Sequence, residues 1–223
     1  MVVTLCAVVA FGALAVALVR WSLLERQDWW MVVGERSVVV AVCGSPGAGK
    51  TTVAAAVARR LRVLHLTRDE IKNGLGLSSA VVAEDGGVRF DEDYYIAGGP
   101  FSLCAEDVLV DAARLFASSR VSFVVEDSVL SRPLLDALRL GDARVLAVHV
   151  VAREAVIGAR LRARAAEGSA VAPQLVAQFR RGEMKPSIFA PPAEVDAVVE
   201  LDTSDQAEPV IEPIEAALTA LLR

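Results

Sequence analysis

The stretch GSPGAGKTT, Gly44–Thr52, directly follows the apolar run SVVVAVC, Ser37–Cys43. That run is short, β-branched and uncharged, which predicts a strand buried on both faces of a sheet. The Ala-rich residues 51–61 behind the stretch predict a helix. The pattern G-x-x-x-x-G-K-[ST] is satisfied by Gly44, Gly49, Lys50 and Thr51. A strand before this pattern and a helix after it are the context in which it binds phosphate groups.

The residue types in this stretch suit the phosphates of a nucleotide. Backbone N–H groups must approach the β-phosphate closely, and glycines permit the tight loop that this requires. A helix beginning at Lys50 points its unpaired N–H groups and its positive dipole end at the anion. We expect Lys50 to reach the β- and γ-phosphates, the Thr51 hydroxyl to hold Mg²⁺ and Thr52 to contact the α-phosphate. The expected ATP contacts are Gly44, Ser45, Pro46, Gly47, Ala48, Gly49, Lys50, Thr51 and Thr52.

Composition narrows the class of protein. The 223 residues are 54% hydrophobic but only 5% aromatic, and the formal net charge is −5. This favours an α/β protein with apolar parallel strands, and it argues against a general nucleic-acid coat but not against a local basic groove. The three cysteines, Cys6, Cys43 and Cys104, fit neither a zinc cluster nor a disulfide framework. A reducing compartment is therefore expected.

Apolar runs and helical patterns alternate from residue 37 onward, which predicts βαβ units and a parallel sheet. Five strands are expected at residues 37–43, 63–66, 121–125, 144–151 and 197–202. Helices are expected at residues 51–61, 101–118, 154–166, 173–181 and 209–222, with a short one from Pro133. The predicted apolar face of the helix at 101–118 holds Leu103, Val108, Leu109, Ala112, Leu115 and Phe116. Residues 74–99, rich in Gly, Ser and acidic side chains, are predicted to be a loop.

The first thirty residues form a separate segment, ahead of a domain at 31–223. Val2–Val19 carries no charge, and at about 1.5 Å per residue in a helix it would just cross a thin bilayer. Basic residues and tryptophans follow it, as interfacial anchors would, which predicts a single membrane anchor with the rest of the chain in the cytoplasm. A start misassigned upstream of Met31 and a buried core helix are the alternatives.

A second group of polar residues follows the second predicted strand, in the segment TRDEIK, Thr67–Lys72. Parallel sheets build their sites at the carboxyl ends of their strands, so Arg68, Asp69 and Lys72 should lie beside the phosphate loop. A carboxylate there can accept the proton of a hydroxyl that attacks the γ-phosphate, and Asp69 is the candidate. The alternative is that Asp69 caps the following helix.

Glu126 and Asp127 follow the third predicted strand, where a carboxylate could orient Mg²⁺, and the sequence leaves open which of them does so. In the predicted helix at 154–166, Arg160 and Arg164 are four residues apart and share a face, while Arg162 points nearly opposite. Cations on one face could close over the γ-phosphate and stabilise charge that develops during transfer. A solvated Arg-rich face is the alternative.

The motifs GSPGAGKTT, TRDEIK, VVEDSVLS and RLRARAAEGSAVAP resemble, in this order, the P-loop kinases related to phage polynucleotide kinase, zeta-toxin-type kinases and chloramphenicol phosphotransferases. The resemblance spans residues 38–204. It implies a P-loop NTPase fold with sheet order 2-3-1-4-5 and an Arg-rich lid. It also implies that Asp69 is the general base, that Lys72 contacts the acceptor, that Arg160 and Arg164 clamp the transferred group, and that residues 201–205 hold the adenine.

These patterns together predict an ATP- and Mg²⁺-dependent phosphotransferase that moves the γ-phosphate to a hydroxyl of a small molecule or nucleic-acid end. Arg68 and Lys72 would bind the acceptor between TRDEIK and residues 74–99. The alternative is an ATPase or switch that couples hydrolysis to a partner. No pattern indicates an obligate protein partner.

Overall fold

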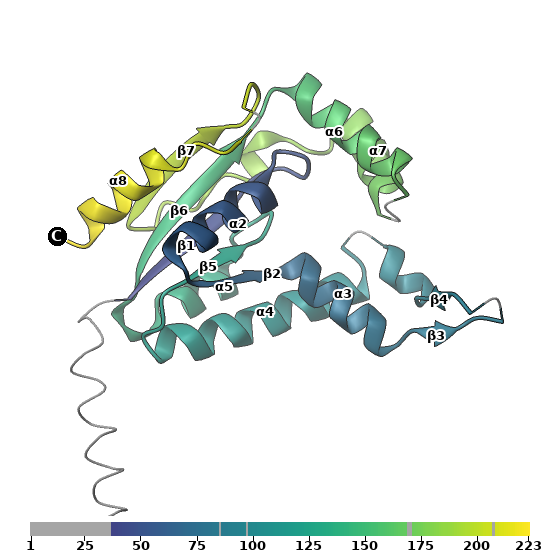
Figure 1. Cartoon of the computed structure of the whole chain (residues 1–223), viewed down its shortest axis with the longest axis horizontal. Helices are drawn as coiled ribbons and strands as arrows, with labels where there is room; N and C mark the ends of the chain where they lie inside the picture. Colours follow the sequence, from purple (N-terminus) through teal and green to yellow (C-terminus); the bar gives the residue numbers. More distant parts are fainter. Residues whose placement is uncertain (1–36, 85, 97, 169–170, 207) are drawn as a thin grey trace, which may run out of the picture. The chain divides into compact units, whose positions relative to one another are not determined.

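The computed structural model describes residues 37–84, 86–96, 98–168, 171–206 and 208–223 (Figure 1). Residues 1–30, which contain the predicted membrane anchor, lie outside the described residues. The anchor therefore stays a prediction. Within the described ranges, no helix is both long and apolar enough to cross a membrane.

Five parallel strands form the central sheet, in the spatial order β2-β5-β1-β6-β7. Counted along the chain among the five predicted strands, this is the order 2-3-1-4-5, so the predicted fold class is confirmed. The strands are β2 (Leu64–Thr67), β5 (Phe123–Glu126), β1 (Val38–Cys43), β6 (Arg144–Val151) and β7 (Ala197–Asp202). All six residues of β1 are buried, as expected for a central strand covered on both faces.

Helices cover both faces of this sheet (Figure 1). Alternate residues of a strand point to opposite faces, so Val39 packs with α4 (Pro100–Ser118) and α5 (Arg132–Leu138), while Val40 packs with α2 (Lys50–Leu61) and α8 (Glu212–Leu221). The two apolar layers hold β1, and with it the start of the phosphate loop, in the middle of the sheet.

A helical pair extends beyond the carboxyl ends of β6 and β7 (Figure 1). It consists of α6 (Glu154–Ala166) and α7 (Ala172–Arg180), close to the predicted helices at 154–166 and 173–181. A short 3₁₀ turn, η2 (Leu140–Asp142), precedes β6. Another, η3 (Pro186–Ile188), follows α7. The last helix, α8, begins at Glu212 rather than at the predicted Pro209.

The prediction of a loop at residues 74–99 is wrong. Helix α3 (Arg68–Ser78) continues through Gly74 and Gly76, and the antiparallel pair β3 (Val81–Val82) and β4 (Val88–Arg89) follows. The turn η1 (Glu92–Tyr95) then places the Tyr94 ring over α3, where a Cβ on Gly76 would lie 2.6 Å from Tyr94 Cδ2. Packing of an aromatic ring on the bare backbone explains a glycine inside this helix.

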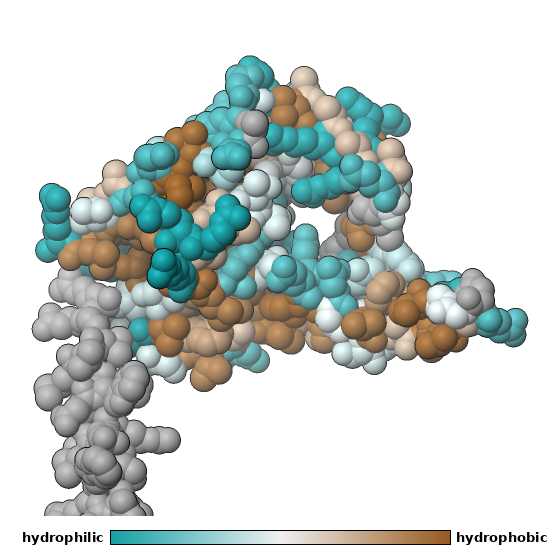
Figure 2. Space-filling view, viewed as in Figure 1, coloured by the Kyte–Doolittle hydropathy of each residue, from teal (hydrophilic) through white to brown (hydrophobic). Residues whose placement is uncertain are grey.

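The predicted apolar face of α4 is also partly wrong. Leu109 is fully buried, but Leu103 and Leu115 are 59% and 62% exposed. The helix instead buries the small residues Ala105, Ala113 and Ala117 together with Leu109, at a spacing of four. Small side chains let α4 lie close to the sheet. Figure 2 shows brown, hydrophobic areas along α4 and the β3–β4 pair, where Leu103, Val108, Leu115, Val81, Val82 and Val88 are exposed.

Candidate active site

The phosphate loop adopts backbone conformations that exclude side chains. Gly44 has φ 143°, and a Cβ there would lie 2.2 Å from the Val150 carbonyl oxygen of β6. Gly49, with φ 99°, occupies the N-cap position just before helix α2. Both dihedrals are open to glycine at little cost and strained for other residues. The glycine spacing in the sequence is therefore a requirement of backbone geometry.

The first turn of α2 presents free donors to this loop. Within the described residues, the backbone N–H groups of Lys50, Thr51 and Thr52 have no acceptor, as is usual for the start of a helix. No acidic residue occupies this first turn. The N-terminus of α2 can therefore bind an anion, and its free N–H groups suit the phosphate chain of a nucleotide.

Lys50 lies folded back on the loop, where its ammonium donates to the Ser45 carbonyl at 3.3 Å. Burial lowers the pKa of Lys50, while the carboxylates of Glu126, Asp69 and Asp127 act in the opposite direction. These carboxylates offset part of the effect of burial, because each favours the charged form of the Lys50 amine.

Glu126 pairs with the phosphate loop. The Thr51 hydroxyl donates to Glu126 Oε1 at 2.7 Å, and the carboxylate is 5% exposed. Glu126 Oε2 lies 3.4 Å from His65 Nε2, but the two atoms are not aligned for a hydrogen bond and both stay buried without a partner. Burial raises the pKa of Glu126, yet His65, Thr51 and Lys50 together outweigh it and hold the pKa below its usual value.

Asp127 faces a different group. Its carboxylate pairs with Arg68 Nη1 at 3.0 Å and accepts from the Ser128 N–H. Burial raises the pKa of Asp127 to about 6, against the lowering effect of Arg68. The arrangement thus separates the two adjacent carboxylates: Glu126 contacts Thr51, and Asp127 orients Arg68.

The chemistry of these donors fits Mg²⁺ bound with phosphates, which takes only one or two protein oxygens and keeps several waters. The Thr51 hydroxyl and the unpaired Glu126 oxygen supply such donors. Across the described ranges, no group of three or more His, Cys, Asp or Glu side chains could hold a metal ion.

A polar cavity of about 430 Å³ joins the phosphate loop to α3. Lys50, Thr51, Arg68, Asp69 and Lys72, all predicted site residues, line it together. Asp69 is exposed, and among the described residues its carboxylate has no hydrogen-bond or ion-pair partner. Thr67 occupies the N-cap position of α3 and Asp69 lies inside the helix, so the alternative reading of Asp69 as the cap is wrong.

Lys72 connects α3 to the segment after β4. It is 7% exposed, donates to the Ile96 carbonyl at 3.2 Å and lies 5.3 Å from the centre of the Tyr94 ring. Burial lowers the pKa of Lys72. The Tyr94 hydroxyl donates to Asn73 Oδ1 at 2.6 Å. Asn73 and Tyr94 line the same cavity, and the sequence analysis missed Asn73 because no spacing rule joins residues 21 positions apart.

The two predicted lid arginines make different contacts. Arg160 donates to the Gly47 and Ala48 carbonyls and, through both terminal nitrogens, to Thr203. Arg164 lines the polar cavity, and no hydrogen bond ties it to another described side chain. Arg160 therefore braces the back of the phosphate loop, while Arg164 lines the polar cavity and, together with Arg160, a second one.

A second cavity, of about 270 Å³, lies between the phosphate loop, α6 and the segment after β7. Thr52, Arg160 and Thr203 line it, as does Gln206, whose Oε1 is buried without a partner. Of residues 201–205, predicted to hold the adenine, Thr203 lines this cavity. Polar and apolar side chains share its walls, and an unpaired acceptor there suits the amino group of a base.

Comparison with known families agrees with this geometry. The family model described as AAA domain matches residues 39–184, more than half of the chain. The chain belongs to the AAA domain family. The match begins in β1 and ends after α7, so this member's phosphate loop, TRDEIK segment and helical pair all lie within the family region. With the sheet order, it confirms the P-loop NTPase fold.

The first of three similar solved structures shares this fold. A candidate kinase from Chloroflexus aurantiacus J-10-fl superposes with a TM-score of 0.64 at 19% identity, covering 84% of this chain and 99% of that one. A sugar kinase from Janibacter sp. HTCC2649 has a TM-score of 0.49 at 22% identity, covering 83% and 94%. A gluconokinase from Sinorhizobium meliloti 1021 has a TM-score of 0.46 at 22% identity, covering 82% and 91%. No curated protein matches this chain significantly.

Proposed function

We propose that this AAA domain protein transfers the γ-phosphate of ATP to a hydroxyl of a polar acceptor. The observation that carries this proposal is the position of Asp69. Its unpaired carboxylate opens onto the same cavity as Lys50 and Thr51, at the carboxyl edge of a parallel sheet. A nucleotide switch needs no such base beside the phosphate loop, whereas a phosphotransferase does.

The phosphate loop and the 270 Å³ cavity are the proposed ATP site. The free N–H groups at the start of α2 would bind the phosphates, and the Gln206 carboxamide oxygen would accept from the adenine amino group. Thr51 and Glu126 would hold Mg²⁺, which supplies charge neutralisation between the phosphate oxygens. Glu126 is preferred to Asp127 because it alone contacts Thr51.

The 430 Å³ cavity is the proposed acceptor site. Asp69 would accept the proton of the acceptor hydroxyl as that oxygen attacks the γ-phosphorus. Lys50 and Arg164 would stabilise the charge on the transferred group from two sides. Lys72 and Tyr94 form the outer wall, and Arg68, held by Asp127, presents its remaining N–H groups to the acceptor. These walls suit a small molecule or a nucleic-acid end that offers several hydroxyl or anionic groups.

The test uses the full chain, γ-labelled ATP and a pool of 5′-hydroxyl oligonucleotides, sugar nucleotides and hydroxyl-bearing antibiotics. Wild-type protein should label one acceptor class, and Lys50→Ala should abolish labelling. Asp69→Asn should lower transfer by at least about 100-fold while ATP affinity changes little, because loss of a general base affects the chemical step.

Glu70→Gln is the matched control, because Glu70 is the next carboxylate along α3, is exposed and does not line the cavity. It should transfer phosphate at the wild-type rate. Label that appears only as free phosphate, equally in wild type and Asp69→Asn, would overturn the proposal in favour of an ATPase or switch.

A further inference from the structure

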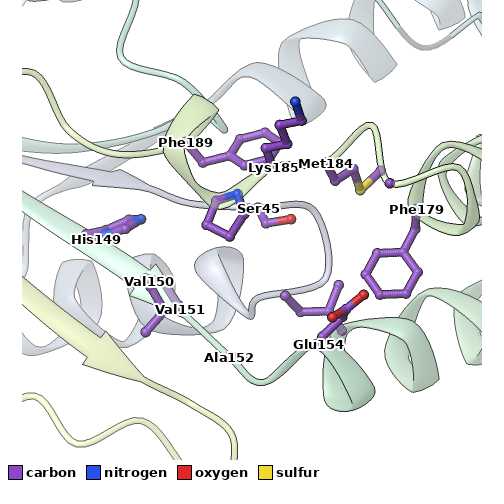
Figure 3. A pocket seen from close by; sticks show the side chains of 13 residues that line it. Ser45, His149, Val150, Val151, Ala152, Glu154, Phe179, Met184, Lys185 and Phe189 are labelled. Carbon is purple, nitrogen blue, oxygen red and sulfur yellow. The ribbon is translucent and has the colours of Figure 1, made fainter.

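A third cavity lies on another side of the phosphate loop (Figure 3). Its volume is about 320 Å³, within the range of about 300–1,000 Å³ typical of small-molecule sites. Ser45 contributes one wall from the phosphate loop, the end of β6 another, and Phe179 of α7 a third. It shares no lining residue with either cavity assigned above. It is therefore a separate place for a ligand.

The walls of this cavity are mainly apolar. Val150, Ile157 and Phe189 are 0%, 8% and 8% exposed, so each is anchored in the interior and offers only part of its surface to the cavity. Phe179 lies against the backbone of α6, where a Cβ on Gly158 would be 2.9 Å from its ring carbon Cε1. An anchored ring and buried aliphatic groups form a rigid receptor for a flat apolar group.

One carboxylate and one ammonium group line the rim, from Glu154 and Lys185, and they point in different directions. Figure 3 shows the Glu154 carboxylate beside the Phe179 ring, whereas the Lys185 ammonium points away from the cavity. Within the described residues Glu154 has no ion-pair partner. His149, also at the rim, already faces Glu200 at 3.4 Å. The cavity therefore offers one unpaired carboxylate next to an aromatic face, an arrangement that attracts a cation.

We propose that this cavity binds a small aryl-alkyl amine. The aromatic ring would occupy the apolar space beside Phe179 and Phe189, and the ammonium group would pair with Glu154. Because Ser45 belongs to the phosphate loop and α6 carries Arg160, an occupant would contact both elements that hold the nucleotide. The bound amine would thus act as an effector of nucleotide affinity.

The experiment titrates the full chain with 2-phenylethylamine and with phenylacetate, which share a ring but differ in charge, by isothermal calorimetry at pH 7.5. For a ligand of about nine heavy atoms, a dissociation constant on the order of millimolar is expected. The amine should bind at least about fivefold more tightly than the acid, because one partly exposed carboxylate attracts one ligand and repels the other.

Glu154→Gln should remove this preference for the amine. Glu212→Gln is the matched control, because Glu212 also lies in the first turn of a helix but far along the chain in α8, and it should keep the preference. Phe179→Ala should weaken both ligands. Three outcomes would overturn the site. Wild type could bind amine and acid equally, or the preference for the amine could persist in Glu154→Gln. The third is no saturable binding at an amine concentration of about ten times the expected dissociation constant.

The effector role is tested in the same titrations. Saturating amine should change the affinity for a non-hydrolysable ATP analogue by at least about threefold. An unchanged analogue affinity, with the amine bound, would overturn the effector role. Amine binding does not depend on the proposed phosphotransfer, so it should persist in Lys50→Ala even where that variant no longer labels an acceptor.

Discussion

Gly44 is the first residue after β1, and the structure around it has no room for a side chain. A Cβ would lie 2.2 Å from the Val150 carbonyl, and φ is 143°. We expect Gly44→Ala to lower the free energy of unfolding by at least about 2 kcal/mol, since it combines a clash with a strained dihedral. Urea unfolding measures this change.

The control is Gly74→Ala, within α3, where a Cβ meets nothing within 4 Å. Alanine is the better helix former, so this variant should gain about 0.5–1 kcal/mol. Equal effects of the two alanines would contradict the packing argument for Gly44.

Cys43, the residue before Gly44, should be chemically inert in the folded protein. Burial raises the pKa of Cys43 to about 12, whereas Cys104 is exposed. Only the thiolate reacts, and at pH 8 the raised pKa leaves Cys43 at least about 1,000-fold less ionised than a thiol that titrates near its ordinary value.

In a Cys6→Ser background, iodoacetamide at pH 8 should therefore label Cys104 alone, as mass spectrometry would show. Adding Cys104→Ser should leave the folded protein unlabelled until denaturant exposes Cys43. Rapid labelling of that folded double variant would contradict the burial of the strand end.

Helix α4 shows how far an apolar pattern determines the packing of an element. The sequence puts Leu109 and Leu115 on one predicted face, but only Leu109 is buried. Leu109→Ala should cost about 2–5 kcal/mol of unfolding free energy, while Leu115→Ala should stay within about 0.5 kcal/mol. Paired thermal and urea unfolding curves provide the comparison. A large loss for Leu115→Ala would mean that its side chain is covered in the folded protein.

At the scale of the whole molecule, Arg160 joins three elements that are far apart in the sequence. From α6 it reaches the phosphate loop carbonyls and Thr203 after β7, and Thr203 in turn donates to the Ala48 carbonyl at 2.6 Å. Lysine cannot reproduce the forked contacts, so Arg160→Lys should lower affinity for an ATP analogue by about tenfold.

Thr203→Val should cost about 1–3 kcal/mol of stability, because the Ala48 carbonyl loses one of its two donors and Arg160 loses the hydroxyl that accepts from it. Arg162→Lys, on the exposed side of α6, is the control and should change neither quantity. Calorimetric titration with the analogue and urea unfolding supply the two measurements. If Arg160→Lys bound the ATP analogue as tightly as Arg162→Lys does, the contacts of Arg160 would not contribute to nucleotide affinity.

The sequence by itself determined the strand–loop–helix unit at Ser37–Leu61, the five strands and, through the resemblance, their parallel order. These features follow from local rules: backbone dihedrals require glycine at particular positions, and side-chain periodicity reports burial. The same rules failed at residues 74–99, where the Tyr94 ring over Gly76 stabilises a helix that glycine-rich composition disfavours. Composition reports average preference, and a single long-range contact outweighs it.

Only the tertiary structure decided between neighbouring side chains of the same chemistry. Glu126 is opposite Val42 in β1 and Thr67 in β2, and this register turns its carboxylate, rather than that of Asp127, toward Thr51. Arg160 and Arg164 share a helix face, yet only Arg160 donates to the carbonyls of the phosphate loop, and of the two only Arg164 lines the polar cavity. Such choices depend on strand pairing and helix placement, which bring together residues whose separation along the chain carries no periodic signal.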